Sequence, residues 1–278
     1  LSMVADIEND PADVEPLPNI DFNIRQGNSL VGYTKITDVL STDSKGNTEL
    51  GNFGEGASGR VRDNFEEIIE AVKKHKKAGD SSDATDWRNV AESRIDEYRQ
   101  NLNQDILEDF HDAGIEDADM EYVEEVSPFH WVLEFANVYS KGGFDVLIGN
   151  PPWEVLEPNR EDYFTKYDEI FRTRMPENKD EKQEELLKNK EIEEGGQEHK
   201  EKMKKRAKYF NNTQQYELQS PTVAGRKMPN KNELSALFFE RAFQLARDES
   251  YVSQILPSAV WNGEIGRASC RERVFPVV

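Results

Sequence analysis

The stretch from Phe144 to Trp153 constrains the fold of this chain more than any other. Its first part, Phe144 to Ile148, is short, apolar and bounded by glycines, which is typical of a strand buried on both faces of a parallel sheet. Pro151 and Pro152 must end that strand, because proline has a fixed φ angle and no N–H to donate to a sheet. The sequence therefore predicts a stiff loop beyond the carboxyl end of a strand, which is where open α/β sheets bind ligands.

Asn150-Pro151-Pro152-Trp153 resembles motif IV of the S-adenosylmethionine-dependent amino-methyltransferases, above all the adenine-N6 DNA methyltransferases. The resemblance implies a doubly wound, Rossmann-like α/β sheet, S-adenosylmethionine as cofactor, and double-stranded DNA with a flipped adenine as substrate. An exocyclic amine is a poor nucleophile because it donates its lone pair to the ring. Asn150 and the stiff Pro151-Pro152 loop would accept the amine hydrogens and localise that lone pair, while Trp153 would stack on the base.

An earlier segment resembles motif III of the same methyltransferases. Residues 20–25 alternate between apolar and polar, which predicts a strand, and Gly27-Asn28-Ser29-Leu30 follows directly. The resemblance gives Asn28, and Asp21 on that strand, as cofactor-binding residues; a plain Gly-Asn turn is the alternative. The family's Phe-x-Gly-x-Gly cofactor loop would precede this motif, and residues 1–20 do not contain it. We therefore expect residues 1–18 to be an irregular cut segment and the chain to be a fragment that binds cofactor weakly and turns over poorly.

Residues 60–114 read as a helical hairpin inserted into the catalytic domain, which we expect at residues 19–34 and 128–262. The apolar positions of the two helices repeat at helical spacing: Phe65, Ile68, Ile69 and Val72, then Trp87, Ala91, Ile95, Tyr98, Leu102, Ile106 and Phe110. The insertion and the Pro-Phe-His-Trp run at residues 128–131 resemble the large single-chain type IIG restriction-modification or phage-defence methylases. His130 lies among aromatic residues, which favours a packed core residue over a ligand.

The chain after the loop changes character three times. Aromatic residues between 154 and 171 suit packing against the sheet or a place beside an extruded base, and residues 176–210 read as a charged helical or disordered insertion that cannot bury a core. Its basic end, residues 200–208, is a candidate phosphate contact. A helix at 233–246 and a strand from Tyr251 then resemble the segment after motif IV. The tail at 263–278 breaks the composition and is expected to be non-native.

The composition bounds the function. The net charge is −20, whereas proteins that contact DNA phosphates normally present a basic surface. The acidity therefore indicates either a halophilic source or a DNA-binding domain outside this chain. One cysteine excludes a disulfide framework or a cysteine zinc site, and the histidines lack ligand spacing, so no metal is expected. No apolar run could cross a membrane, and a cytoplasmic protein is expected.

The sequence thus favours a restriction-modification DNA methyltransferase specific for adenine N6, in which further domains of the same protein could take part. Two alternatives stay open. The Asn-Pro-Pro-aromatic loop also serves methylation of glutamine amides in proteins, and the chain could instead be a non-catalytic DNA-binding or interaction module that retains the methylase fold.

Overall fold

A computed structural model describes residues 22–34, 40–42, 48–50, 57–78, 82–219, 222–223, 226–227, 233–258 and 260 of the chain. The segment 1–18, Asp21 and the tail 263–278 lie outside the described residues, so the expectations placed on them stay predictions.

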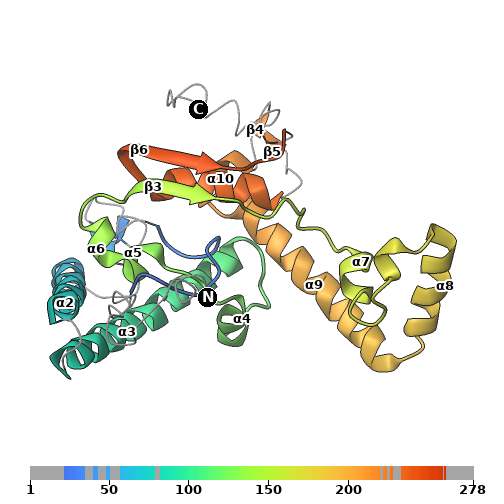
Figure 1. Ribbon diagram of the computed structural model, residues 1–278, viewed down its shortest axis with the longest axis horizontal. Coiled ribbons are helices and arrows are strands. Elements are labelled where there is room, and N and C mark those ends of the chain that lie inside the picture. Colours follow the sequence, from blue (N-terminus) through green and yellow to red (C-terminus); the bar gives the residue numbers. More distant parts are fainter. Residues whose placement is uncertain are drawn as a thin grey trace, which may run out of the picture.

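Two parallel strands, β3 (Phe144–Gly149) and β6 (Ala246–Gln254), lie side by side, as Figure 1 shows. Val146 is the register partner of Tyr251, and Ile148 is the partner of Ser253. Parallel strands need a crossover connection, and here it contains every element between β3 and β6. The last of these elements, α10 (Leu234–Leu245), runs directly into β6. Parallel pairing of the predicted central strand is confirmed, and the strand pair with its helices is consistent with an α/β methyltransferase fold.

Helices and short strands complete the described part of the chain. They are β1 (Leu40–Thr42), β2 (Thr48–Leu50), α2 (Ala57–Ala78), α3 (Ser82–Asp112), α4 (Met120–Val126), α5 (Trp131–Glu134), α6 (Ala136–Tyr139), α7 (Arg160–Phe164), η3 (Phe171–Thr173), α8 (Pro176–Leu186), α9 (Lys190–Asn212), η4 (Glu217–Gln219), β4 (Thr222–Val223) and β5 (Arg226–Lys227). The pairs β1–β2 and β4–β5 are antiparallel.

The long helices α2 and α3 pack along each other and hold much of the core (Figure 1). Ile68 and Val72 of α2 are buried, as are five apolar positions of the α3 stripe: Ala91, Ile95, Leu102, Ile106 and Phe110. Burying a stripe of this length supplies most of the stability of such helices, because propensity alone contributes little.

The predicted strand at residues 20–25 is wrong over its described part, where residues 22–24 form turns and bends. Phe22 has a left-handed φ of 63°, is 4% exposed, and packs edge-on against the ring of His75 on α2. Arg25 lies over the Phe22 ring and donates to Glu92 on α3 at 2.9 Å. These contacts to the helical hairpin outweigh the alternating pattern, because a strand would turn successive side chains to opposite faces.

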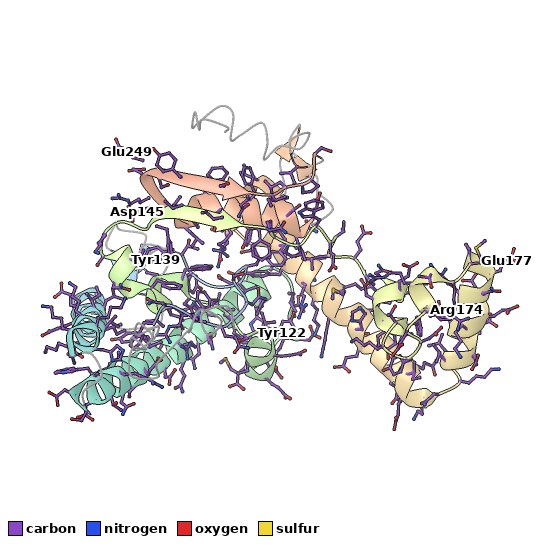
Figure 2. All side chains as sticks on the ribbon, viewed as in Figure 1. Tyr122, Tyr139, Asp145, Arg174, Glu177 and Glu249 are labelled. Carbon is purple, nitrogen blue, oxygen red and sulfur yellow. The ribbon has the colours of Figure 1, made fainter. Side chains whose placement is uncertain are left out.

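The prediction that β3 is buried on both faces is also wrong in this structure. Phe144 contacts the rings of Trp131, Phe135 and Tyr139, whereas Val146 is 53% exposed and Ile148 is 83% exposed. Tyr251 on β6, the register partner of Val146, is also exposed, so within the described residues this side of the strand pair faces solvent. Figure 2 shows Asp145 and Glu249 at the end of this strand pair that lies away from α8.

A helical arm projects from the body and comprises α7, η3, α8 and the first half of α9 (Figure 1). It has a small core of its own, in which Tyr163, Phe164, Phe171 and Ile192 are buried. The expectation that this charged region buries no core is therefore wrong. The aromatic residues after the loop pack against each other and against α9 rather than against the sheet, and a place beside an extruded base stays a prediction.

Candidate active site

The Asn-Pro-Pro-Trp loop leaves the sheet at the carboxyl end of β3, as the sequence predicts. Pro151 is buried, whereas Asn150, Pro152 and Trp153 are exposed. The loop is anchored where it ends, because Leu234 at the start of α10 donates its N–H to the Glu154 carbonyl at 2.8 Å. Buried proline at one end and a backbone hydrogen bond at the other hold the loop with little freedom.

Trp153 ties the loop to the carboxyl end of the second strand. Its indole Nε1 donates to the carbonyl of Ile255 at 3.2 Å, and Ile255 N donates to the Gly149 carbonyl at 3.1 Å. The indole edge is thereby fixed while the side chain stays 52% exposed. A ring held by its edge and open to solvent is able to stack on a flat ligand.

The two predicted acceptors of this loop are free to bind. Among the described residues, neither the Asn150 side chain nor the Pro151 carbonyl takes part in a hydrogen bond. The side-chain oxygen of Asn150 and the carbonyl oxygen of Pro151 can each accept one hydrogen from an amine. The Asn150 side chain is exposed to solvent, whereas Pro151 is buried.

Asn28 lies in a turn that is hydrogen-bonded to the segment just before α5. Its backbone N–H donates to the Ser127 carbonyl at 2.7 Å, and its side-chain oxygen accepts from Leu30 N at 3.2 Å. The indole of Trp131 donates to the Ser29 carbonyl at 3.0 Å and fixes the other side of the turn. The Oδ1 atom is thus used by the turn, and the Nδ2 group of Asn28 makes no hydrogen bond to the described residues.

A cavity of about 200 Å³ connects Asn28 to the end of the loop segment. Its walls are mostly apolar and include Leu156, three positions after Trp153, and Phe238 of α10. Tyr122 and Arg206 supply polar groups, and the buried Tyr122 hydroxyl has no hydrogen-bond partner among the described residues. Sequence reasoning missed these wall residues, because they come from segments that no local motif connects.

His130 is a structural residue, as predicted. It is fully buried, its Nδ1 accepts from Tyr33 N at 3.4 Å, and its Nε2 lies 3.0 Å from Asn103 Oδ1. Burial, with a smaller contribution from the Arg99 charge, lowers the pKa of His130 to about 3. A neutral imidazole therefore bridges α3 and the Asn28 turn at physiological pH.

Part of the basic end of α9 is engaged within the chain. Lys202 pairs with Glu125 at 2.6 Å, Lys205 pairs with Asp117 at 2.7 Å, and Lys208 donates to the Gly114 carbonyl. These contacts dock α9 against α4 and the end of α3. Lys200 and Lys204 are exposed, so the candidate phosphate contact stays a prediction. In the described part of the chain no cluster of acidic, histidine or cysteine residues could hold a metal ion.

Comparison with known families identifies the class of protein. A family model described as Eco57I restriction-modification methylase matches residues 33–184, which include the helical hairpin, β3 and the Asn-Pro-Pro-Trp loop. This match defines the chain as a methylase, and the fold is consistent with that class. Since the match covers more than half of the sequence, the chain belongs to the Eco57I restriction-modification methylase family.

A curated relative comes from Methanocaldococcus jannaschii and is described as a type II restriction enzyme and methyltransferase. It is 25% identical over 193 residues, which cover 55% of this chain and 16% of the relative. The chain thus spans about a sixth of the length of that relative. No solved structure matches the chain. Among the described helices, none is both long and apolar enough to span a membrane.

Proposed function

We propose that this chain is part of the catalytic domain of an adenine-N6 DNA methyltransferase in a restriction-modification system. The observation that carries the proposal is the exposed and unengaged Asn150 amide beside the Pro151 carbonyl, at the carboxyl edge of two parallel strands. The membership of the methylase family supports the same reaction class.

The chemistry follows from what these atoms can do. Asn150 Oδ1 and the Pro151 carbonyl each accept one hydrogen of the adenine amine and draw its lone pair out of conjugation with the ring. Trp153 stacks on the flipped base, a contact worth roughly 1–3 kcal/mol per base. S-adenosylmethionine, when bound, supplies a methyl group on a sulfonium centre, and no protein nucleophile is needed.

The residues present fit part of a cofactor site. Asn28 keeps its Nδ2 donor free and lines the 200 Å³ cavity, whose apolar walls suit a purine ring. Asn28 would therefore hold the adenine of S-adenosylmethionine by an amide hydrogen bond. Asp21 remains a second candidate for cofactor binding.

Substitution Asn150→Ala tests the proposal in the protein that carries this chain. Loss of one acceptor at the reacting amine should lower methyl transfer to duplex DNA by about 100-fold or more. Because Asn150 is exposed, the melting temperature should not change. Asn101→Ala on α3 makes the same chemical change away from the loop and should retain full activity.

The readout is tritiated methyl incorporation into duplex DNA, with a glutamine peptide as competing substrate. Full activity of Asn150→Ala on DNA would contradict the assigned role. Methylation of the peptide alone would show that the substrate is a protein amide and not adenine. Absence of methyl transfer to either substrate by the wild-type protein would favour a binding module.

A further inference from the structure

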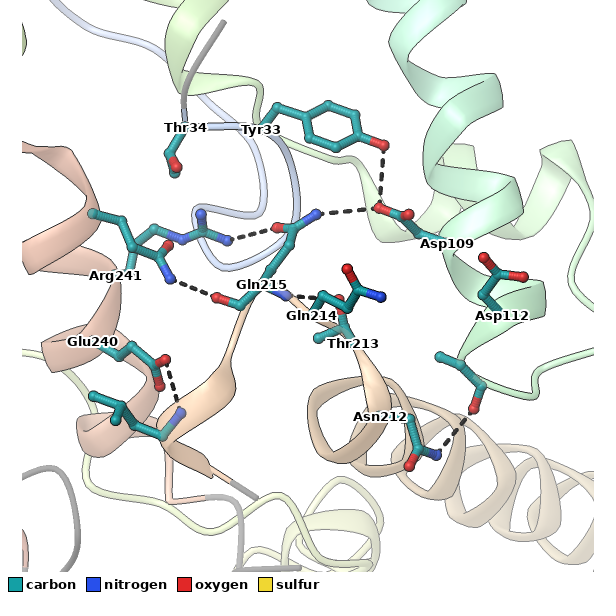
Figure 3. Close-up of a pocket in the computed structure, with 13 residues that line it drawn as sticks. Tyr33, Thr34, Asp109, Asp112, Asn212, Thr213, Gln214, Gln215, Glu240 and Arg241 are labelled. Carbon is teal, nitrogen blue, oxygen red and sulfur yellow. Dashed lines mark hydrogen bonds between the residues drawn. The ribbon is translucent and has the colours of Figure 1, made fainter. Parts of the chain in front are cut away.

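A second and larger cavity of about 680 Å³ lies between the end of α3, the segment after α9 and the second half of α10 (Figure 3). Its position separates it from the proposed methylation site. Leu234 at the start of α10 bonds to the catalytic loop, whereas Gln244 near the other end of the helix lines this cavity. Ten helical residues span roughly 15 Å, so the two sites lie at opposite ends of α10.

Carboxylates from one face of α3 point to this cavity. Asp109 and Asp112 line it one helical turn apart (Figure 3). Asp105 precedes Asp109 by a further turn and lies outside the lining. Within the described part of the chain, no lysine or arginine forms an ion pair with any of the three. The buried carboxylate of Glu134, by contrast, contacts Arg99 at 2.6 Å.

Asp109 is only partly satisfied by its protein partners. Tyr33 Oη donates to Asp109 Oδ2 at 3.1 Å, and Gln215 Nε2 donates to the same oxygen at 3.2 Å (Figure 3). The other carboxylate oxygen receives no donor from the described residues. An acceptor that is partly buried and lacks donors costs free energy until a ligand or water satisfies it.

One further buried polar atom on the α10 wall of this cavity, Oε1 of Gln244, has no hydrogen-bond partner among the described residues. Native proteins leave few such atoms unsatisfied, and a ligand that carries several donors would satisfy it.

Arg241 also lines this cavity, but in the described part of the chain it forms no ion pair with Asp109. Arg241 is 2% exposed and donates to the Leu30 carbonyl at 2.7 Å and to the Tyr216 hydroxyl at 2.9 Å. The Gln215 amide lies between the guanidinium and Asp109, since Arg241 donates to Gln215 Oε1 and Gln215 Nε2 donates to Asp109 (Figure 3). The cavity therefore keeps an excess of acceptors and negative charge on its α3 side.

We propose that this cavity binds an organic polycation of the polyamine class, with ammonium groups directed at Asp109 and Asp112. An ammonium group is a compact cation with three N–H donors and no acceptor, which matches this set of carboxylate and amide oxygens. Side chains one helical turn apart have Cβ atoms about 5–6 Å from each other, close to the spacing of neighbouring ammonium groups in spermidine. The described residues offer no cluster that could hold a metal ion, which disfavours a divalent metal.

Titration calorimetry of the chain with spermidine, at low ionic strength, tests the proposal. We expect one site with a dissociation constant of about 10–100 µM. Asp112→Asn changes an exposed rim residue that the fold does not need, and should weaken binding several-fold. Asp109→Asn should weaken it by about tenfold or more, since it removes the inner charge. The matched control is Asp86→Asn, an exposed carboxylate at the other end of α3, which should leave binding unchanged.

Three outcomes would overturn the inference. The first is the absence of binding at about millimolar spermidine. The second is equal weakening by all three substitutions, which would indicate diffuse attraction to an acidic surface. The third is Mg²⁺ binding that is tighter than spermidine binding and is lost in Asp109→Asn. The test involves no methyl transfer, so its result is independent of the proposed function.

Discussion

Asp109 is a carboxylate that the fold desolvates without supplying a counter-charge. Burial, more than the charges of Asp112 and Glu108, raises its pKa to about 6, although the hydrogen bonds from Tyr33 and Gln215 oppose the rise. A proton therefore binds Asp109 more tightly in the folded chain than in the unfolded chain. The stability contributed by this protonation is fully present below the unfolded pKa near 3.8 and is lost as the pH rises through about 6.

Asp109→Asn should accordingly stabilise the chain at about pH 8 by about 1–2 kcal/mol, because an amide oxygen can still accept from Tyr33 and Gln215 without a buried charge. The gain should vanish at about pH 4, where the carboxylate of the wild-type chain is protonated. Urea titrations at both pH values measure the difference. A gain of equal size at the two pH values would show that the buried charge is not its cause.

At the scale of elements, α9 depends on two glycines that helix propensity disfavours. The helix continues through Gly195 and Gly196, and the ring of Tyr163 packs directly against them. A Cβ atom on Gly195 would lie 2.6 Å from Tyr163 Oη, and this hydroxyl donates to the Ile192 carbonyl at 2.7 Å. The glycines thus provide the close approach on which the core of the arm is built.

Gly195→Ala should lower the free energy of unfolding by about 1–3 kcal/mol, although alanine is the better helix former. In a Tyr163→Phe background the clashing hydroxyl is absent, and the next ring atom lies 3.7 Å from the added Cβ. There the same substitution should stabilise the chain by up to about 1 kcal/mol. A double-mutant cycle by urea titration checks this change of sign; the same sign in both backgrounds would contradict the packing.

At the scale of the whole molecule, the β3–β6 pair presents an apolar face to solvent. Val146 and Ile148 are exposed together with Tyr251, the register partner of Val146, which is 67% exposed. Parallel sheets are normally covered on both faces, and exposed apolar patches promote association. The net charge of −20 opposes self-association, because like-charged chains repel each other.

Ile148→Ser should reduce association of the chain at high salt, where the repulsion is screened. It should cost less than about 0.5 kcal/mol of stability, because the side chain is already 83% exposed. Leu133→Ser, at a position that is 1% exposed, is the control and should cost about 2–5 kcal/mol. Sedimentation velocity and urea titration measure both effects. Unchanged association of Ile148→Ser would show that this face takes no part in self-association.

The sequence alone determined the features that depend on neighbouring residues. Proline chemistry at Pro151 and Pro152 ends β3 where predicted, and helical spacing identified the stripe from Ala91 to Phe110 that α3 buries. The family resemblance drawn from Asn150 to Trp153 agrees with the matched family. Backbone sterics and side-chain periodicity act within a few residues, so the sequence displays them directly.

Only the tertiary structure decided features that depend on residues far apart in the chain. The turn at Phe22 replaced an expected strand because α2 and α3 hold its side chains, and the charged arm acquired a core because Tyr163 meets Ile192. The cavity beside Asp109 exists because α3 and α10 meet there. Contacts of this kind are set by packing between elements, and no local pattern of the sequence records which elements will meet.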